Sequence, residues 1–165
     1  MPVAAVLLVA ALVVGYFHVS LDWLGPDRPA LGWTVFGLAL ALLALLMLWQ
    51  IRNVQLGRPH TRPGIVIPVL MSLSVLVFAA GYFVLTRDPG EFSGLRTRLD
   101  ALYFTLATLA TVGYGDITPH GQSARAVTML QILYNFVFLT AAATALSQHV
   151  RSRAGRHRTR DDEGT

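Results

Sequence analysis

Four long stretches of this chain contain no charged residue, and they restrict its possible folds more than any other feature. They extend over Met1–Leu21, Pro29–Ile51, Pro63–Thr86 and Ala126–Val150. Each is at least as long as the roughly 20 apolar residues with which a helix crosses a hydrocarbon core about 30 Å thick. Only 13% of the 165 residues are charged, about half the usual share in a soluble domain. The sequence therefore predicts an all-α membrane protein with four transmembrane helices.

The first stretch is expected to remain in the protein as a span rather than to be removed as a signal peptide. No basic residue precedes it, and its apolar part is longer than the usual core of a signal peptide. The four expected helices extend over Val3–Ser20, Leu31–Ile51, Gly64–Leu85 and Ser123–Gln148. The spans contain neither a pair of carboxylates nor a cluster of histidines, and cysteine is absent. This composition excludes disulfides and does not favour an enzyme.

The distribution of arginine predicts the orientation of the spans. Most arginines lie in the Arg52–Pro63 loop and in the tail after Val150. Basic loops stay in the cytoplasm, so we expect a multi-pass protein of the cell membrane with both termini cytoplasmic. The arginines of the tail, between Arg151 and Arg160, are interpreted as topology determinants, and binding of anionic lipid is the alternative. They also account for most of the basic character, which is therefore no argument for nucleic-acid binding.

A fifth uncharged stretch, Ala101–Gly115, is too short to cross the membrane and is expected to be re-entrant. Thr97, followed three residues later by Asp100, resembles a capping box and predicts a helix over Arg98–Ala110. At 1.5 Å per residue this helix is about 20 Å long and ends near the middle of the bilayer, where its carbonyl end favours a cation. The following chain lacks helical hydrogen bonds, so it must be buried in protein or line a water-filled path.

The two glycines after this helix are expected to adopt positive φ. A returning strand whose carbonyls all face one axis cannot keep the geometry of an ordinary strand, and glycine adopts positive φ at little cost. Gly113 and Gly115 meet that requirement. Thr111 would add a ring of hydroxyls below the carbonyls, and Tyr114 would point outward as a packing residue.

The nine residues from Thr108 to Asp116, TLATVGYGD, resemble the signature of tetrameric potassium channels. The resemblance covers about Gly64–Val150 and implies an outer helix, a pore helix, a selectivity filter and an inner helix. It implies that potassium binds the filter without any other cofactor and that the pore is homotetrameric, since one chain supplies one filter. The implied ion-binding residues are Thr111, Val112, Gly113, Tyr114 and Gly115, with Asp116, Tyr103 and Thr108 as filter support.

With this resemblance, the chain divides into three parts. Residues 1–63 are expected to form an N-terminal two-helix transmembrane hairpin, residues 64–150 the pore module, and residues 151–165 a short basic cytoplasmic tail. No span carries arginine at every third position, so the first two helices are not a voltage sensor. Membrane lipids are the other expected partners.

The chain departs from the family pattern at three positions. Ala107 replaces an acid that many relatives place behind the filter. Tyr103 stands where others have tryptophan, and two interpretations stay open: its phenol bonds Asp116, or its ring packs between subunits. Asn135 occupies the position of the usual hinge glycine. The other cavity and gate candidates implied by the resemblance are Phe136, Leu139, Ala143 and Ser147.

Thr128, Gln131 and Asn135 lie on one face of the expected inner helix. We interpret them as hydrogen-bonding partners of the pore helix, and a role in the ion path is the alternative. A potassium-selective channel is the expected function. The alternatives are a non-conducting or regulatory membrane protein that retains the fold, and a carrier subunit, which would need four such loops in one chain.

Overall fold

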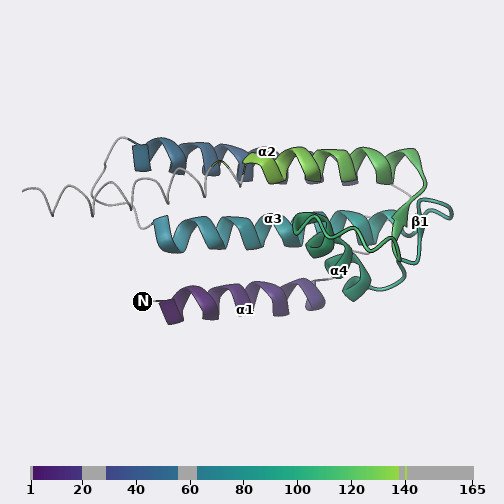
Figure 1. Cartoon of the computed structure of the whole chain (residues 1–165), viewed down its shortest axis with the longest axis horizontal. Helices are drawn as coiled ribbons and strands as arrows, with labels where there is room; N and C mark the ends of the chain where they lie inside the picture. The colour runs from purple at the N-terminus through teal and green to yellow at the C-terminus, as the bar shows by residue number, and fades with distance from the viewer. Residues whose placement is uncertain (1, 20–28, 56–62, 138–139, 141–165) are drawn as a thin grey trace, which may run out of the picture.

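The computed structural model describes residues 2–19, 29–55, 63–137 and 140. The helices are α1 (Pro2–His18), α2 (Pro29–Gln55), α3 (Pro63–Leu85) and α4 (Arg98–Leu109). Residues 122–137 form a further helix, the last helix. Two short strands, β1 (Phe92–Ser93) and β2 (Thr118–Pro119), pair antiparallel. Figure 1 shows the long helices running along one direction, with α4, β1 and β2 gathered toward one end of the molecule.

The observed helices follow the expected ones closely at their beginnings. Three of them start with proline, at Pro2, Pro29 and Pro63, where a missing N–H breaks no helical hydrogen bond. Helix α4 agrees with the predicted Arg98–Ala110 except for its last residue. Helix α2 extends four residues beyond the expected end at Ile51. The predicted end of the first helix at Ser20 lies outside the described residues.

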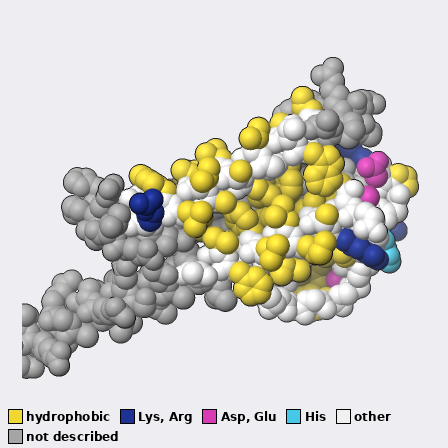
Figure 2. All heavy atoms as spheres, turned by 90° about the horizontal axis from the view of Figure 1, so that it is seen from above, with side chains coloured by type: hydrophobic (Ala, Val, Ile, Leu, Met, Phe, Trp, Pro, Cys, Tyr) yellow, Lys and Arg dark blue, Asp and Glu magenta, His cyan; other side chains and the backbone are white. Residues whose placement is uncertain are grey.

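Large hydrophobic side chains are exposed over much of the described chain. Two helical segments, Leu31–Gln50 and Pro68–Leu85, are long and apolar enough to cross a membrane by length and composition, and α1 contains a shorter apolar segment, Val6–His18. Figure 2 shows hydrophobic side chains over the middle of one face, with the charged side chains near its ends. This distribution matches a slab of hydrocarbon between two aqueous phases.

Helix α3 is the centre of the fold, because α1, α2 and α4 all pack against it. Figure 1 shows α1 and α2 on either side of α3. On the α1 side, Tyr16 packs with Leu76 and Ala79. On the α2 side, Phe36 lies edge-on against Phe78, with ring centroids 5.8 Å apart. Both of the first two helices therefore pack against α3.

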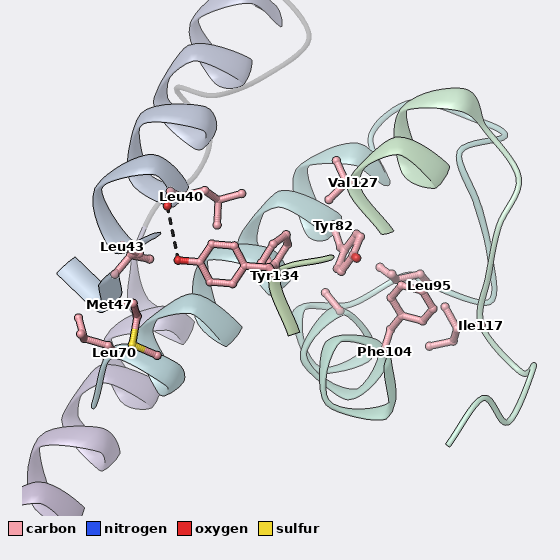
Figure 3. Packing of buried hydrophobic residues seen from close by; sticks show 12 residues of the cluster. Leu40, Leu43, Met47, Leu70, Tyr82, Leu95, Phe104, Ile117, Val127 and Tyr134 are labelled. Carbon is pink, nitrogen blue, oxygen red and sulfur yellow. Dashed lines mark hydrogen bonds between the residues drawn. The ribbon is translucent and has the colours of Figure 1, made fainter. Parts of the chain in front are cut away.

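A cluster of aromatic rings joins α3 to α4 and β1. Tyr82 is fully buried, and its ring centroid lies 5.0 Å from that of Phe104 and 5.5 Å from that of Phe92. Both contacts are edge-to-face, the arrangement that aromatic quadrupoles favour. Figure 3 shows Tyr82 directed toward Phe104, Leu95 and Ile117 of the same core cluster. These contacts place α4 beside the C-terminal part of α3, which contains Tyr82.

Arg98, the first residue of α4, is bonded to the carboxyl end of α1. Its guanidinium donates to the carbonyl oxygens of Tyr16 at 2.6 Å and Val19 at 2.7 Å. In return, the Tyr16 hydroxyl donates to the Arg98 carbonyl at 3.0 Å. The last carbonyls of a helix have no partner within it, and a cation there is favoured by the helix dipole. The N-terminal helix is thus joined directly to the start of α4.

Glu91, in the loop before β1, caps the amino end of the last helix. Its carboxylate accepts a hydrogen bond from the Ala124 N–H at 2.6 Å, and its carbonyl accepts from Gly121 N–H at 3.1 Å. A Cβ atom at Gly121 would collide with this carboxylate. Glycine at this position therefore leaves room for a cap that comes from another part of the chain, and the negative charge also complements the helix dipole.

We expect Glu91→Ala to lower the free energy of unfolding by about 0.5–2 kcal/mol, the usual cost of losing an N-cap. The measurement is thermal unfolding of the protein in detergent, followed by circular dichroism. Asp88→Ala is the matched control, because Asp88 is an exposed acid of the same loop. Equal melting temperatures for the two variants would contradict the assignment of Glu91 as a cap.

Candidate functional site

The segment Thr111–Gly115, the TVGYG segment, follows α4 directly, and α4 has a well-defined start. Thr97 and Asp100 form a capping box: the Thr97 hydroxyl accepts from Asp100 N–H at 3.1 Å, and the Asp100 carboxylate accepts from Thr97 N–H at 2.8 Å. The N–H of Arg96 donates to the same carboxylate at 3.0 Å. These backbone donors hold the pKa of Asp100 below its usual value. The predicted capping box is confirmed.

Helix α4 ends in a Schellman motif, and this ending turns the chain into the TVGYG segment. The Thr111 N–H donates to the Thr108 carbonyl at 3.1 Å, and the Val112 N–H donates to the Ala107 carbonyl at 3.0 Å. Thr111 has a φ of 55° in this motif, at the position that glycine usually fills. A β-branched residue pays about 1–2 kcal/mol for that conformation. The sequence did not indicate this conformation, since threonine gives no sign of it.

The sign of φ alternates along the TVGYG segment. Thr111, Gly113 and Gly115 have φ values of 55°, 65° and 79°, whereas Val112 and Tyr114 are not among the residues with positive φ. The predicted positive φ of both glycines is therefore confirmed. In the described part of the chain, no hydrogen bond ends on a carbonyl oxygen of this segment. Because backbone carbonyls normally find partners, the segment offers a row of oxygens to a ligand.

Tyr103, in α4, contacts the TVGYG segment from behind. Its ring stacks on that of Tyr114, with centroids 6.2 Å apart and an angle of 12° between the planes. Interaction with the Asp116 carboxylate raises the pKa of the Tyr103 phenol. The hydrogen bond between them stays a prediction, as does packing of the ring between subunits. The carboxylate of Asp116 accepts from the Ile117 N–H at 3.1 Å.

The chain beyond Asp116 is held by the pairing of β1 with β2, in which Ser93 lies opposite Thr118. Gly94 follows β1 with a φ of +85°, and a Cβ atom there would collide with the backbone oxygen of Asp116. No side chain larger than a hydrogen atom fits between the backbone of Gly94 and that of Asp116. Gly94 could not be identified from the sequence, because nothing in the sequence indicates which segment approaches it.

The last helix reaches α4 through two side-chain amides. Gln131 Nε2 donates to the Thr105 carbonyl at 2.9 Å, and Asn135 Nδ2 makes a long bond of 3.5 Å to the Thr108 carbonyl. The expectation that these residues bond the helix before the TVGYG segment is confirmed. Thr128, the third residue of the polar face, bonds the Ala124 carbonyl of its own helix. Phe136 is exposed in the single chain, and Leu139, Ala143 and Ser147 lie outside the described residues.

The chain is similar to known channels. A family model described as an ion channel matches residues 70–152. The two-pore potassium channel 4 of Arabidopsis thaliana is 34% identical over 90 residues, which are 53% of this chain and 31% of that protein. The voltage-gated potassium channel Kch of Escherichia coli is 26% identical over 114 residues, 69% of this chain and 27% of the relative.

A third relative is archaeal. The hyperpolarization-activated voltage-gated potassium channel of Methanocaldococcus jannaschii is 27% identical over 81 residues, 49% of this chain and 37% of that protein. The chain thus spans about a third of the length of each of these three relatives. No solved structure matches the chain significantly.

Proposed function

Because this chain belongs to the ion-channel family and carries the pore loop of its potassium channels, we propose that it is a potassium-selective channel. Four copies would surround one axis, and potassium would cross the membrane passively along it. The carbonyl oxygens of Thr111, Val112, Gly113, Tyr114 and Gly115 would replace the hydration shell of the ion.

The observation that supports this proposal most strongly is the alternating φ of the TVGYG segment. In an ordinary strand successive carbonyls point to opposite sides. Alternation of right- and left-handed residues instead turns successive peptide groups to one side. Together with carbonyls that accept no hydrogen bond from the described residues, this backbone suits a dehydrated cation. The carboxyl end of α4 directly below it, with an effective charge near −0.5, favours the same ion.

The proposed assembly is a homotetramer with four spans in each subunit and both termini in the cytoplasm of the cell. One chain supplies one quarter of each ring of oxygens, so the site is incomplete without three further copies. Several apolar side chains of α4, the TVGYG segment and the last helix are exposed in the single chain and would be covered by neighbouring copies. They are Leu99, Leu106, Val112, Tyr114, Leu133 and Phe136.

In the proposed channel, Asp116, Tyr103 and Thr108 support the filter. The bond from Tyr103 to Asp116 would hold the outer end of the filter, since Ala107 has no side chain that could reach it. Asn135, Phe136, Leu139, Ala143 and Ser147 are the proposed cavity and gate residues. Anionic lipid at the arginines of the tail is part of the proposal as well.

Two of the relatives are named as voltage-gated, but opening of this channel is proposed to depend only weakly on voltage. A gating charge that crosses the field contributes about 2.3 kcal/mol per 100 mV. No span of this sequence carries the repeated arginines that would supply such charges.

The test is ion flux from liposomes that contain the purified full-length chain. With potassium as the only permeant cation, we expect rapid flux, and with sodium as the only permeant cation, flux near that of protein-free liposomes. Native mass measurement of the same sample should give four chains for each particle.

Equal fluxes of potassium and sodium would contradict the proposed selectivity. A correctly assembled tetramer without flux in either salt would favour the alternative, a non-conducting or regulatory protein that retains the fold. A monodisperse dimer that conducts would contradict the proposed assembly.

A further inference from the structure

Gln131 is a buried amide that joins three helices. Its side chain is 1% exposed. Its Oε1 accepts a hydrogen bond from the Tyr82 hydroxyl of α3 at 2.7 Å, and its Nε2 donates to the Thr105 carbonyl of α4 at 2.9 Å. Tyr82 and Thr105 are both fully buried. The three groups therefore form one polar connection through an otherwise apolar core.

The bond from Gln131 to α4 is additional to the hydrogen bonds of α4 itself. The Thr105 carbonyl lies in the last turns of α4. The Thr105 hydroxyl donates a hydrogen bond to the Ala101 carbonyl at 2.7 Å. A carbonyl oxygen has two lone pairs, so it accepts from Gln131 without losing its place in the helix. Gln131 thus contacts the backbone of α4. This contact fixes where α4 lies along the last helix.

The position of α4 matters because the TVGYG segment starts two residues after α4 ends. Asn135, one turn beyond Gln131, makes its long bond to the Thr108 carbonyl, within the Schellman motif that leads to Thr111. A shift of α4 along the last helix would leave the buried amide of Gln131 without partners, and an unpartnered buried amide is costly. The apolar contacts around it would tolerate such a shift far better.

We propose that Gln131 is a positioning residue for ion selectivity: through Tyr82 and Thr105 it holds α4 at the depth at which the TVGYG segment binds potassium. This inference rests on the proposed function. Gln131 does not touch the ion in this arrangement. It acts through α4, and selectivity depends on it because a built site tolerates displacements of only about 0.5 Å.

The first experiment compares two variants by the ratio of potassium flux to sodium flux in liposomes. Gln131→Met keeps the length and volume of the side chain but removes both hydrogen bonds, and we expect it to lower the ratio by about tenfold or more. Tyr134→Phe is the matched control. It also removes a polar group from the last helix, but the Tyr134 hydroxyl donates to the Leu40 carbonyl of α2 at 3.5 Å. Its flux ratio should stay near that of the unmodified chain.

The second experiment restores the two bonds with a group that titrates. In Gln131→Glu the protonated acid has one oxygen to accept from Tyr82 and one hydroxyl to donate to Thr105, whereas the ionised acid has no donor. Tyr82 is the titratable group in contact with this position, and α4 contributes the Thr105 carbonyl. Burial raises the pKa of such an acid, to about 8–9 in documented cases. The flux ratio of Gln131→Glu should therefore be near normal at about pH 6 and fall toward that of Gln131→Met at about pH 9.

A role in packing alone would change the amount of assembled channel but not its flux ratio, so the ratio decides between the two roles. An assembled Gln131→Met channel with an unchanged flux ratio would overturn the inference while leaving the proposed function intact. If Gln131→Met does not assemble, Tyr82→Phe, which removes one bond of the two, takes its place with the same expectation. An unmodified chain that conducts no potassium would overturn the proposed function and the inference with it.

Discussion

Gly113→Ala should abolish potassium selectivity or conduction altogether. Gly113 has a φ of +65°, and a Cβ atom there would meet nothing within 4 Å in the single chain. The expected loss is therefore conformational: alanine resists positive φ by about 1 kcal/mol or more, and the penalty applies in each copy of the proposed tetramer. Residue 113 would return to negative φ, and the alternation that turns the carbonyls to one side would be lost. Liposome flux with potassium or sodium as the only cation measures the effect.

The control is Gly90→Ala. Gly90 has a φ of +96° and also has open space around its Cα, but it lies in the loop before β1, away from the TVGYG segment. Its substitution carries a similar conformational penalty without changing the carbonyls, so selective flux should be retained. If Gly113→Ala kept the potassium preference of the unmodified chain, the assignment of the filter would be wrong.

Gly94→Ala should have the largest effect on stability. The added methyl group would collide with the backbone oxygen of Asp116 and lie 3.4 Å from the Ile117 Cα, in a residue whose φ is +85°. Backbone atoms cannot rotate aside as a side chain does. We expect a loss of about 2–4 kcal/mol of unfolding free energy for each subunit, the sum of strain and overpacking. The thermal midpoint of the detergent-solubilised protein is the measurement.

Two other glycines make this prediction specific. At Gly90 alanine brings strain without collision, and at Gly121 it collides with the Glu91 side chain, which can move. Both variants should therefore melt above Gly94→Ala. Because Asp116 directly follows the filter, Gly94→Ala should also lower the ratio of potassium to sodium flux in whatever tetramer remains. A midpoint for Gly94→Ala equal to that for Gly90→Ala would show that the close approach to Asp116 is not maintained in solution.

The sequence was most informative where the responsible interactions are local. The apolar helices follow from stretches without charge, and the start of α4 follows from Thr97 and Asp100, which are one turn apart. Gly113 and Gly115 were expected at positive φ because glycine pays little for it, and both adopt it. Gln131 and Asn135 were expected to bond the neighbouring helix, because an amide within an apolar span must find a partner.

The sequence was silent where distant segments meet. Thr111 has positive φ because the end of α4 and the chain that follows it require this conformation. Threonine has no propensity for positive φ from which it could be predicted. The contacts of Gly94 with Asp116 and of Glu91 with Ala124 could not be predicted from the sequence either. Each pair brings together residues that are more than twenty positions apart, and no periodicity connects them.

What the sequence by itself determined is therefore where the helices begin, the capping box of α4, and the positive φ of Gly113 and Gly115. The tertiary structure alone decided how the TVGYG segment is held: which helix supplies the amide behind α4, which carboxylate caps the last helix, and which cation, Arg98, meets the end of α1. The physical reason is range. Backbone conformation and capping depend on neighbours within one or two turns, whereas the partner of a buried polar group depends on which helices pack together.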